Sequence, residues 1–291
     1  MGVKKILVFL NKCDAVTDPE MHELVEMEVR ELLSQYDYDG DDVSVIKGSA
    51  LKALEGSTEE IGIPAIEKLV SAMDSEIPEP ERLIERDFMM SIEGAHNISG
   101  RGTVVTGTID TGECKLNQDV HLIGVKRKPT PSTITGIETF HKQMDNARAG
   151  DNCGILLRGV TKNDIKRGMC LIKPGTQDVR RNFEAEVYIL KPDEGGRAKP
   201  FKTGYRPQAF IRTADVSCEV NLPEDKQMAL PGDNFTSHLK IGFPLPMTVG
   251  LKFALREGGK TVAAGIVTKL LEDSETDIKE DEERAAKKKG K

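Results

Sequence analysis

The stretch "LVFLNKCD", residues 7–14, places four apolar residues directly before an asparagine, a lysine, a cysteine and an aspartate. The apolar run, Leu7 to Leu10, predicts a buried strand that ends where the polar residues begin. A helix is predicted to follow, because Asp18 can cap its N-terminus and Pro19 suits its first turn. A second short strand over residues 43–46 and a second helix over residues 63–75 continue this α/β pattern, which favours parallel strands joined by crossover helices.

The polar residues after the first strand suit the recognition of a purine base. In an open α/β sheet, ligands bind at the carboxyl ends of the strands, where Asn11, Lys12 and Asp14 are expected. A carboxylate at Asp14 can accept two N–H bonds from the edge of guanine, which adenine cannot donate. Asn11 is predicted to bridge toward the base or to brace the neighbouring loop, and the aliphatic stem of Lys12 to cover the face of the ring.

A second loop supplies what the first one lacks. Ser49-Ala50-Leu51 follows the second predicted strand, and the backbone N–H of Ala50 can donate to guanine O6. Taken alone, the first loop could also be an ordinary polar turn after a buried strand. The two loops together predict a guanine pocket formed by Asn11, Lys12, Asp14, Ser49, Ala50 and Leu51.

Composition limits the remaining function classes. The 291 residues carry a formal net charge of −7, which argues against binding nucleic acid through a global basic field but leaves room for a local basic face. The five cysteines form no C-x-x-C pair, so reduced thiols and no structural metal are expected. No apolar run is long enough for a membrane span, and the N-terminus has no targeting character, so a soluble chain is expected.

The pattern changes near residue 85, where short alternating strands begin, broken by Gly, Pro and Asn. Their regular spacing predicts two all-β barrels, with a break between Lys173 and Arg181. The last residues lose their apolar content: residues 272–283 hold eight acids against one lysine, and residues 284–291 hold five basic residues. This composition predicts a disordered, solvated tail over residues 272–291.

Several long motifs resemble one family of proteins. "VFLNKCD", "GSALKALEG", "HNISGRGTVVTG", "EVYILKPDEGGR", "LPGDN" and "LREGGKTVAAG" closely resemble the elongation factor Tu family, GTPases that carry aminoacyl-tRNA to the ribosome. The resemblance spans about residues 1–271 in family order and implies an α/β remnant of a P-loop-type GTPase domain followed by two all-β barrel domains. The implied domains are the C-terminal part of the GTP-binding domain (1–84), a second domain that binds the aminoacyl end (85–178) and a third domain that contacts tRNA and the exchange factor (179–271).

The chain departs from this family in its phosphate-binding motifs. A G-x-x-x-x-G-K-[ST] loop would have to precede Asn11, and none does. The nearest match, "ALREGGKT" at residues 254–261, is flanked by strand-like sequence and is interpreted as a hairpin turn, and "DYDG" at residues 37–40 is interpreted as a loop. We therefore expect weak or absent binding of GTP or GDP, no catalytic residue and no metal site, with Mg²⁺ needed only in a chain that carries these motifs. Whether the chain is an enzyme stays open.

The resemblance also implies a tRNA site on the second domain. Arg101, Glu138 and Asn152 keep the residue types of the family, whereas Gly94, His96 and His141 depart from the bacterial types. The "ETFHK" form, together with "IPAIEKLVSAMDSEIP" and the extended tail, looks more like the mitochondrial members than the bacterial ones. The implied aminoacyl-tRNA-binding residues are Glu93, His96, Arg101, Glu138, His141 and Asn152. For Arg101 the alternative is a surface arginine paired with local carboxylates.

Two functions follow from the resemblance. The first is a translation elongation factor similar to the GTP-dependent carrier of aminoacyl-tRNA to the ribosomal A site, here without P-loop and switches. It would have the ribosome and the nucleotide exchange factor Ts as partners, would be a monomer, and would work in the mitochondrial matrix or, alternatively, in a bacterial-type cytoplasm. The second is a non-enzymatic tRNA- or protein-binding module made of the two barrels.

Overall fold

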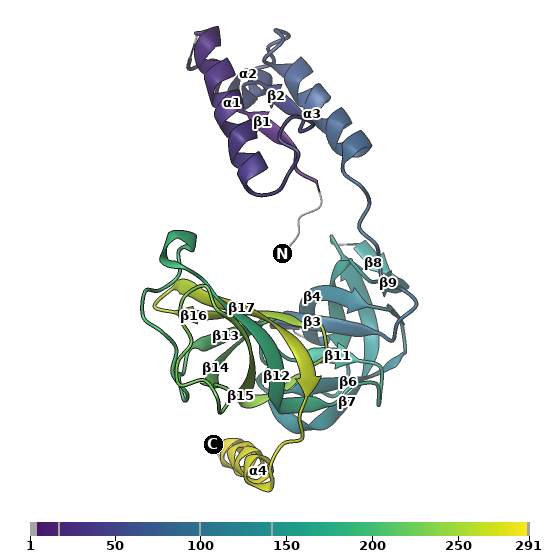
Figure 1. The fold of residues 1–291 in the computed structure, drawn as a ribbon. Coiled ribbons are helices and arrows are strands. Elements are labelled where there is room, and N and C mark those ends of the chain that lie inside the picture. Colours follow the sequence, from purple (N-terminus) through teal and green to yellow (C-terminus); the bar gives the residue numbers. More distant parts are fainter. Residues whose placement is uncertain (1–4, 17, 99, 141, 290–291) are drawn as a thin grey trace. The chain divides into compact units, whose positions relative to one another are not determined.

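The computed structural model describes residues 5–16, 18–98, 100–140 and 142–289 (Figure 1). The chain divides between Glu81 and Arg82 into two compact units, which are described separately. No helix in the described part of the chain is long and apolar enough to cross a membrane.

The first unit is an α/β unit, as the sequence predicts. Its elements are β1 (Val8–Leu10), α1 (Pro19–Gln35), β2 (Val45–Lys47), α2 (Ala50–Leu54) and α3 (Ile63–Glu76). β1 and β2 pair in parallel, with Phe9 opposite Ile46. Asp18 is the N-cap of α1, and its carboxylate accepts a hydrogen bond from the backbone N–H of Glu20 at 3.0 Å. Both predicted helices are therefore confirmed. The two strands are shorter than predicted: β1 is half-buried instead of buried, and β2 ends at Lys47, one residue later than expected.

Ionic contacts attach α1 to the strand pair, beside which α1 and α3 lie (Figure 1). The guanidinium of Arg30 donates to the backbone oxygens of Gly40 and Val43, and thereby fixes the loop that leads into β2. Glu26 of α1 pairs with Lys47 of β2 at 2.9 Å and with Arg30 at 2.8 Å. Hydrogen bonds from Lys47 and Arg30 lower the pKa of Glu26 below its usual value.

The second unit begins with a sheet that closes on itself, here named the first barrel. Its strand order is β10-β4-β3-β11-β6-β7-β8, and β10 pairs with both β4 and β7, so that the sheet forms a ring. A separate pair, β5 (Glu113–Lys115) and β9 (Asn146–Arg148), accompanies it. The strands of the sheet are β3 (Met89–Ile98), β4 (Gly102–Thr111), β6 (Asp119–Gly124), β7 (Lys126–Thr139), β8 (Lys142–Met144), β10 (Asn152–Leu157) and β11 (Cys170–Ile172).

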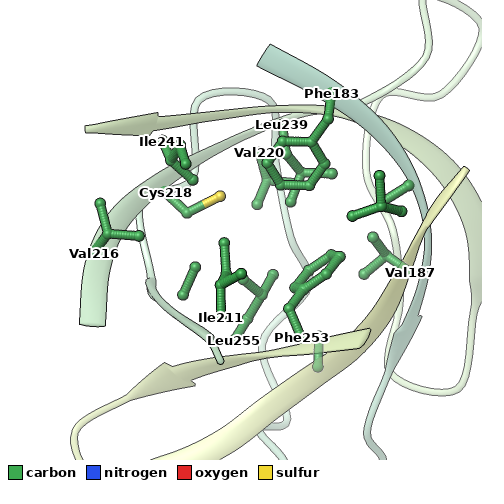
Figure 2. Packing of buried hydrophobic residues seen from close by; sticks show 14 of the residues in the cluster. Phe183, Val187, Ile211, Val216, Cys218, Val220, Leu239, Ile241, Phe253 and Leu255 are labelled. Carbon is green, nitrogen blue, oxygen red and sulfur yellow. The ribbon is translucent and has the colours of Figure 1, made fainter. Parts of the chain in front are cut away.

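The remaining strands form a closed barrel of order β12-β15-β14-β13-β16-β17, here named the second barrel. Figure 2 shows apolar side chains of β12 to β16 meeting in the interior, where the rings of Phe183 and Phe253 pack edge to face. Gly258 and Gly259 have positive φ angles between the last two strands, which confirms the predicted hairpin turn. The strands are β12 (Val179–Ile189), β13 (Gln208–Ile211), β14 (Ala214–Asn221), β15 (Asn234–Pro246), β16 (Lys252–Glu257) and β17 (Lys260–Leu270).

The two barrels contact each other through backbone groups as well as side chains. The N–H of Val125 donates to the carbonyl of Pro244 at 2.7 Å, and the N–H of Gly168 donates to Thr213 Oγ1 at 3.2 Å. Gly168 has a φ of +90°, and an added Cβ there would lie 2.6 Å from the Cβ of Ala214. Only glycine permits this close approach of the two barrels.

The C-terminal segment corrects the prediction of a disordered tail. Residues Glu275–Lys289 form a helix, α4, and the side chains of Asp277 and Asp281 are buried. Ser274 and Asp277 form reciprocal hydrogen bonds at its N-terminus, since each side chain accepts from the other residue's backbone N–H. The acids of the segment are compensated by basic side chains of the two barrels, a pairing that composition alone does not reveal.

We expect the first unit to be less stable than the second. No residue of α1 is buried, and Leu24, Met27 and Leu32 on that helix are exposed, whereas each barrel encloses a large apolar cluster. The backbone amides of β1 and β2 should therefore exchange with solvent at least about tenfold faster than those of β10 and β15 in native-state hydrogen exchange. Equal protection throughout the chain would contradict this expectation.

Candidate functional site

The two predicted guanine loops lie side by side in the first unit. The backbone pairing of β1 and β2 continues past the strands, because the N–H of Gly48 donates to Leu10 O at 2.9 Å and the N–H of Cys13 donates to Gly48 O at 3.1 Å. Cys13 is buried and also donates its thiol to Leu10 O. The loop of residues 11–14 is thereby held against Ser49 and the first residues of α2, so the second predicted loop is in fact the start of a short helix.

Asn11 connects the loops directly. Its side-chain oxygen accepts hydrogen bonds from the backbone N–H groups of Lys12 at 2.9 Å and Ala50 at 3.0 Å. Asn11 thus braces the neighbouring loop, which is one of its two predicted roles. The Ala50 amide, expected to be open for guanine O6, already donates to Asn11, so a contact with O6 requires that the amide be shared. Lys12 has a left-handed backbone conformation, with φ +64°, and its side chain is exposed.

The remaining loop residues leave one acidic group available. The Asp14 side chain is half-exposed, and no hydrogen bond or ion pair within the described residues engages its carboxylate. Ser49 is fully buried and caps α2, with its hydroxyl accepting from the N–H of Lys52 at 3.2 Å. Leu51 is 56% exposed at the same edge. The arrangement suits a planar base with N–H donors for Asp14, with Ser49 as structural support.

The second candidate site is a groove on the outer face of the first barrel. Ring closure aligns one row of residues across four strands: Gly94 of β3 opposite Thr106 of β4, Thr106 opposite Gly154 of β10, and Gly154 opposite Glu138 of β7. Their chain neighbours Val105, Ile155 and Ile137 are buried in the core, so the row faces outward.

A second row lies beside the first: His96, Val104, Leu156 and Gly136. Glycines in the two rows leave the surface hollow between the strands. A Cβ added at Gly154 would lie 3.2 Å from Val104 Cγ1, and one at Gly136 would lie 3.3 Å from Leu156 Cβ. The result is a groove of about 940 Å³ with an apolar floor.

Charged and aromatic residues line the rim of the groove. His96, Arg101 and Glu138, three of the predicted tRNA-binding residues, are brought together there. Arg101 lies in the β3–β4 turn, where its N–H donates to Ile98 O at 3.0 Å. Arg158 and Phe140 also line the groove, and Phe140 is 89% exposed with φ +49°. A site with an apolar floor and ionic rim suits a nucleoside or an aminoacyl ester better than an unmodified phosphate.

Glu93 of β3 and Asn152 of β10 lie on either side of β4, next to the groove. The hydroxyl of Thr108 donates to the Glu93 carboxylate at 3.4 Å, and the side-chain amide of Asn152 donates to the hydroxyl of Thr108 at 3.2 Å. Glu93 occupies a β-bulge, because the register with β4 shifts between Ile92 and Gly94. His141 lies outside the described residues.

Sequence reasoning missed Phe140 and Arg158 as residues of the groove. Phe140 stands within "ETFHK", directly before His141, and an aromatic residue among polar ones was an available signal. Arg158 follows β10, and the pairing of β10 with β4, with Leu157 opposite Thr103, brings it to the same groove as Arg101. No group of three or more acidic, histidine or cysteine side chains that could hold a metal ion occurs in the described part of the chain.

Comparison with known families agrees with this architecture. Three family models match the sequence: Elongation factor Tu GTP binding domain over residues 1–79, Elongation factor Tu domain 2 over residues 102–172, and Elongation factor Tu C-terminal domain over residues 176–271. An α/β unit followed by two β-rich domains, one of them a closed barrel, is the domain set of a translational GTPase. The three matches lie in order along the chain and support a translational GTPase like elongation factor Tu, with a role of the elongation-factor type in translation.

The hydrogen bonds of Asn11 predict that the stability of the first unit depends on Asn11 but not on Asp14. Asn11→Ala removes the acceptor of two backbone N–H groups and should lower the free energy of unfolding of the first unit by about 1 kcal/mol. Asp14→Asn, the matched control, should change that free energy by less than about 0.5 kcal/mol, because no described protein group engages its carboxylate. Denaturant unfolding of the two variants tests this, and an undiminished stability of Asn11→Ala would contradict the role of the brace.

Proposed function

We propose that the groove of the first barrel binds the aminoacyl end of tRNA. The observation that carries the proposal is that His96 and Glu138, from two adjacent rows, line one groove whose floor is hollowed by Gly136 and Gly154, with Arg101 at the rim. The match to Elongation factor Tu domain 2 covers this floor. Within this family, the groove is the best candidate for a site that accepts a terminal nucleoside.

The groove residues have separate roles in this proposal. Val104 and Leu156 provide an apolar surface for the face of the terminal base, and the exposed Phe140 ring can stack against it. Arg101 supplies charged N–H donors for the phosphate backbone. Glu138 accepts from a ribose hydroxyl, since a carboxylate is an acceptor only. The neighbouring Glu93 and Asn152 then face the aminoacyl group, with His141 as a further residue that the resemblance implies.

The first unit contributes guanine recognition to the proposal. Asp14 accepts from the base, Asn11 holds the two loops together, and the exposed Lys12 covers the ring. The described residues thus fit the base of GTP or GDP. They provide no phosphate-binding loop and no metal ligands, so we propose weak or absent nucleotide binding and derive no hydrolytic step.

The partners and the cellular location of the protein are proposed from its resemblance to the family. We propose the ribosome and the exchange factor Ts as partners, a monomeric state, and a mitochondrial matrix location, with a bacterial-type cytoplasm as the alternative. The mitochondrial proposal rests on "ETFHK" at residues 138–142 and "IPAIEKLVSAMDSEIP" at residues 63–78, which resemble mitochondrial members more than bacterial ones. A non-enzymatic module is the second candidate, because every residue that lines the groove belongs to the second unit. The groove is therefore complete without the nucleotide loops.

Substitution of the groove should weaken the binding of aminoacyl-tRNA. Arg101→Gln removes a charged donor and should raise the dissociation constant by about ten- to a hundredfold. Gly154→Val fills the floor with a residue type that favours strands, and should weaken binding without loss of the barrel. Titration of fluorescently labelled aminoacyl-tRNA measures both effects, and unfolding curves monitor the fold.

The matched control is Arg148→Gln, which removes an exposed arginine of the same domain outside the groove. It should change the dissociation constant less than about twofold. Equal losses in Arg101→Gln and Arg148→Gln would indicate a general charge effect and would contradict the groove as the site. Repeating the titration with GTP separates the two candidate functions: tighter binding in its presence supports the GTP-dependent carrier, and no change supports the module.

A further inference from the structure

The C-terminal segment connects the two barrels through buried charges. Arg127, at the start of β7 in the first barrel, pairs with Asp273 at 2.8 Å and with Asp281 of α4 at 2.8 Å. Both carboxylate side chains are 2% exposed, and that of Arg127 is 18% exposed. A forked guanidinium can hold two carboxylates at once, which an ammonium group cannot do with the same geometry.

The same acids contact the second barrel from the other side. Asp273 accepts hydrogen bonds from the backbone N–H groups of Arg181 and Asn182 at 2.9 and 3.0 Å. Asp277 pairs with Lys240 of β15 at 2.6 Å and accepts from the side-chain amide of Asn182 at 3.0 Å. The segment is therefore attached to the second barrel by covalent continuity and by several polar contacts, and to the first barrel mainly through Arg127.

The second barrel contains a buried arginine, Arg181, that needs the acids of the C-terminal segment as partners. β12 has a bulge between Arg180 and Asn182, and the Arg181 side chain is only 5% exposed. It donates to Ile241 O and pairs with Glu280, Asp277 and Asp281. A buried arginine without these acids would be an uncompensated charge. Burial opposes ionisation of Asp277, but hydrogen bonds from Lys240, Ser274 and Asn182 hold its pKa well below the usual value, so it stays charged.

The helix itself places these acids correctly. Asp277 and Asp281 are four residues apart and therefore share one face of α4, which is turned toward the barrels. Arg284, one turn further, donates to Gly242 O of the second barrel. The opposite face carries exposed acids such as Glu282 and Glu283, which accounts for the strongly acidic composition of the segment.

We propose that residues 273–284 act as a clasp, a segment of the second barrel that fixes the orientation of the first barrel by holding Arg127 between two carboxylates. The proposal is independent of what the groove binds. The clasp supplements direct contacts between the barrels, which include the hydrogen bonds of the Val125 and Gly168 amides and those of Thr213 with Arg167 and Ile92. Its loss should loosen this junction before it loosens either barrel.

Native-state hydrogen exchange of the full chain tests the clasp at these two amides. In Arg127→Gln, the amides of Val125 and Gly168 should exchange at least about tenfold faster, while those of Ile109 and Val267, inside the two barrels, should change less than about twofold. The variant should still fold, because Asp273 keeps its backbone donors and Asp281 keeps Arg181. Lys173→Gln is the matched control, since it removes an exposed ion pair with Asp87 in the second unit.

A second variant removes the charge of the clasp residue on α4. Asp281→Asn should accelerate exchange of the same two amides. The double variant with Arg127→Gln should show less than the sum of the single effects, because both substitutions remove the same ion pair between Arg127 and Asp281. Unchanged exchange at Val125 and Gly168 in Arg127→Gln would overturn the proposal and leave α4 as a covering of the second barrel alone. Equal acceleration of all four monitored amides would overturn it too, since it would indicate general destabilisation.

Discussion

The double pairing of β10 is the constraint on which the candidate tRNA site depends. This strand hydrogen-bonds to β4 on one side and to β7 on the other, and so joins residues about fifty positions apart in the chain into continuous rows. Without closure, the row that begins at Gly94 would end at Gly154 on β10, and Glu138 on β7 would lie toward the opposite edge of the sheet. Because β10 contributes Gly154 to one row and Leu156 to the other, the strand that closes the ring also forms the floor of the groove.

Local sequence signals predicted where helices and turns begin more successfully than which groups their side chains contact. The Asp18-Pro19 start of α1 and the Gly258-Gly259 hairpin depend on a few adjacent residues, and the structure confirms both. That the two predicted guanine loops are adjacent follows from parallel pairing of their strands. The sequence did not predict that the Ala50 amide donates to Asn11, because this hydrogen bond depends on the orientation of the Asn11 side chain, which a sequence pattern leaves open.

The groove and the C-terminal helix depend on contacts between distant residues. Glycine at positions 136 and 154 is unremarkable in sequence, and its effect appears only when the register places both glycines on one outer face. The acidic tail was expected to be disordered because its compensating charges, Arg127 and Arg181, lie far earlier in the chain. One local signal did point to a helix: Ser274 and Asp277 have the spacing of a capping box.

The most direct test of the central claim is a titration of the isotopically labelled chain with a 3′-aminoacyl-adenosine, followed by the amide resonances of the barrels. Binding in the groove predicts saturable shifts at Gly136 and Gly154, together with Gly102 at the start of β4. Amides on β13 and β16 of the second barrel should stay unchanged. Saturable shifts confined to the second barrel or to the first unit, or no shifts at saturating ligand, would contradict the assignment of the groove.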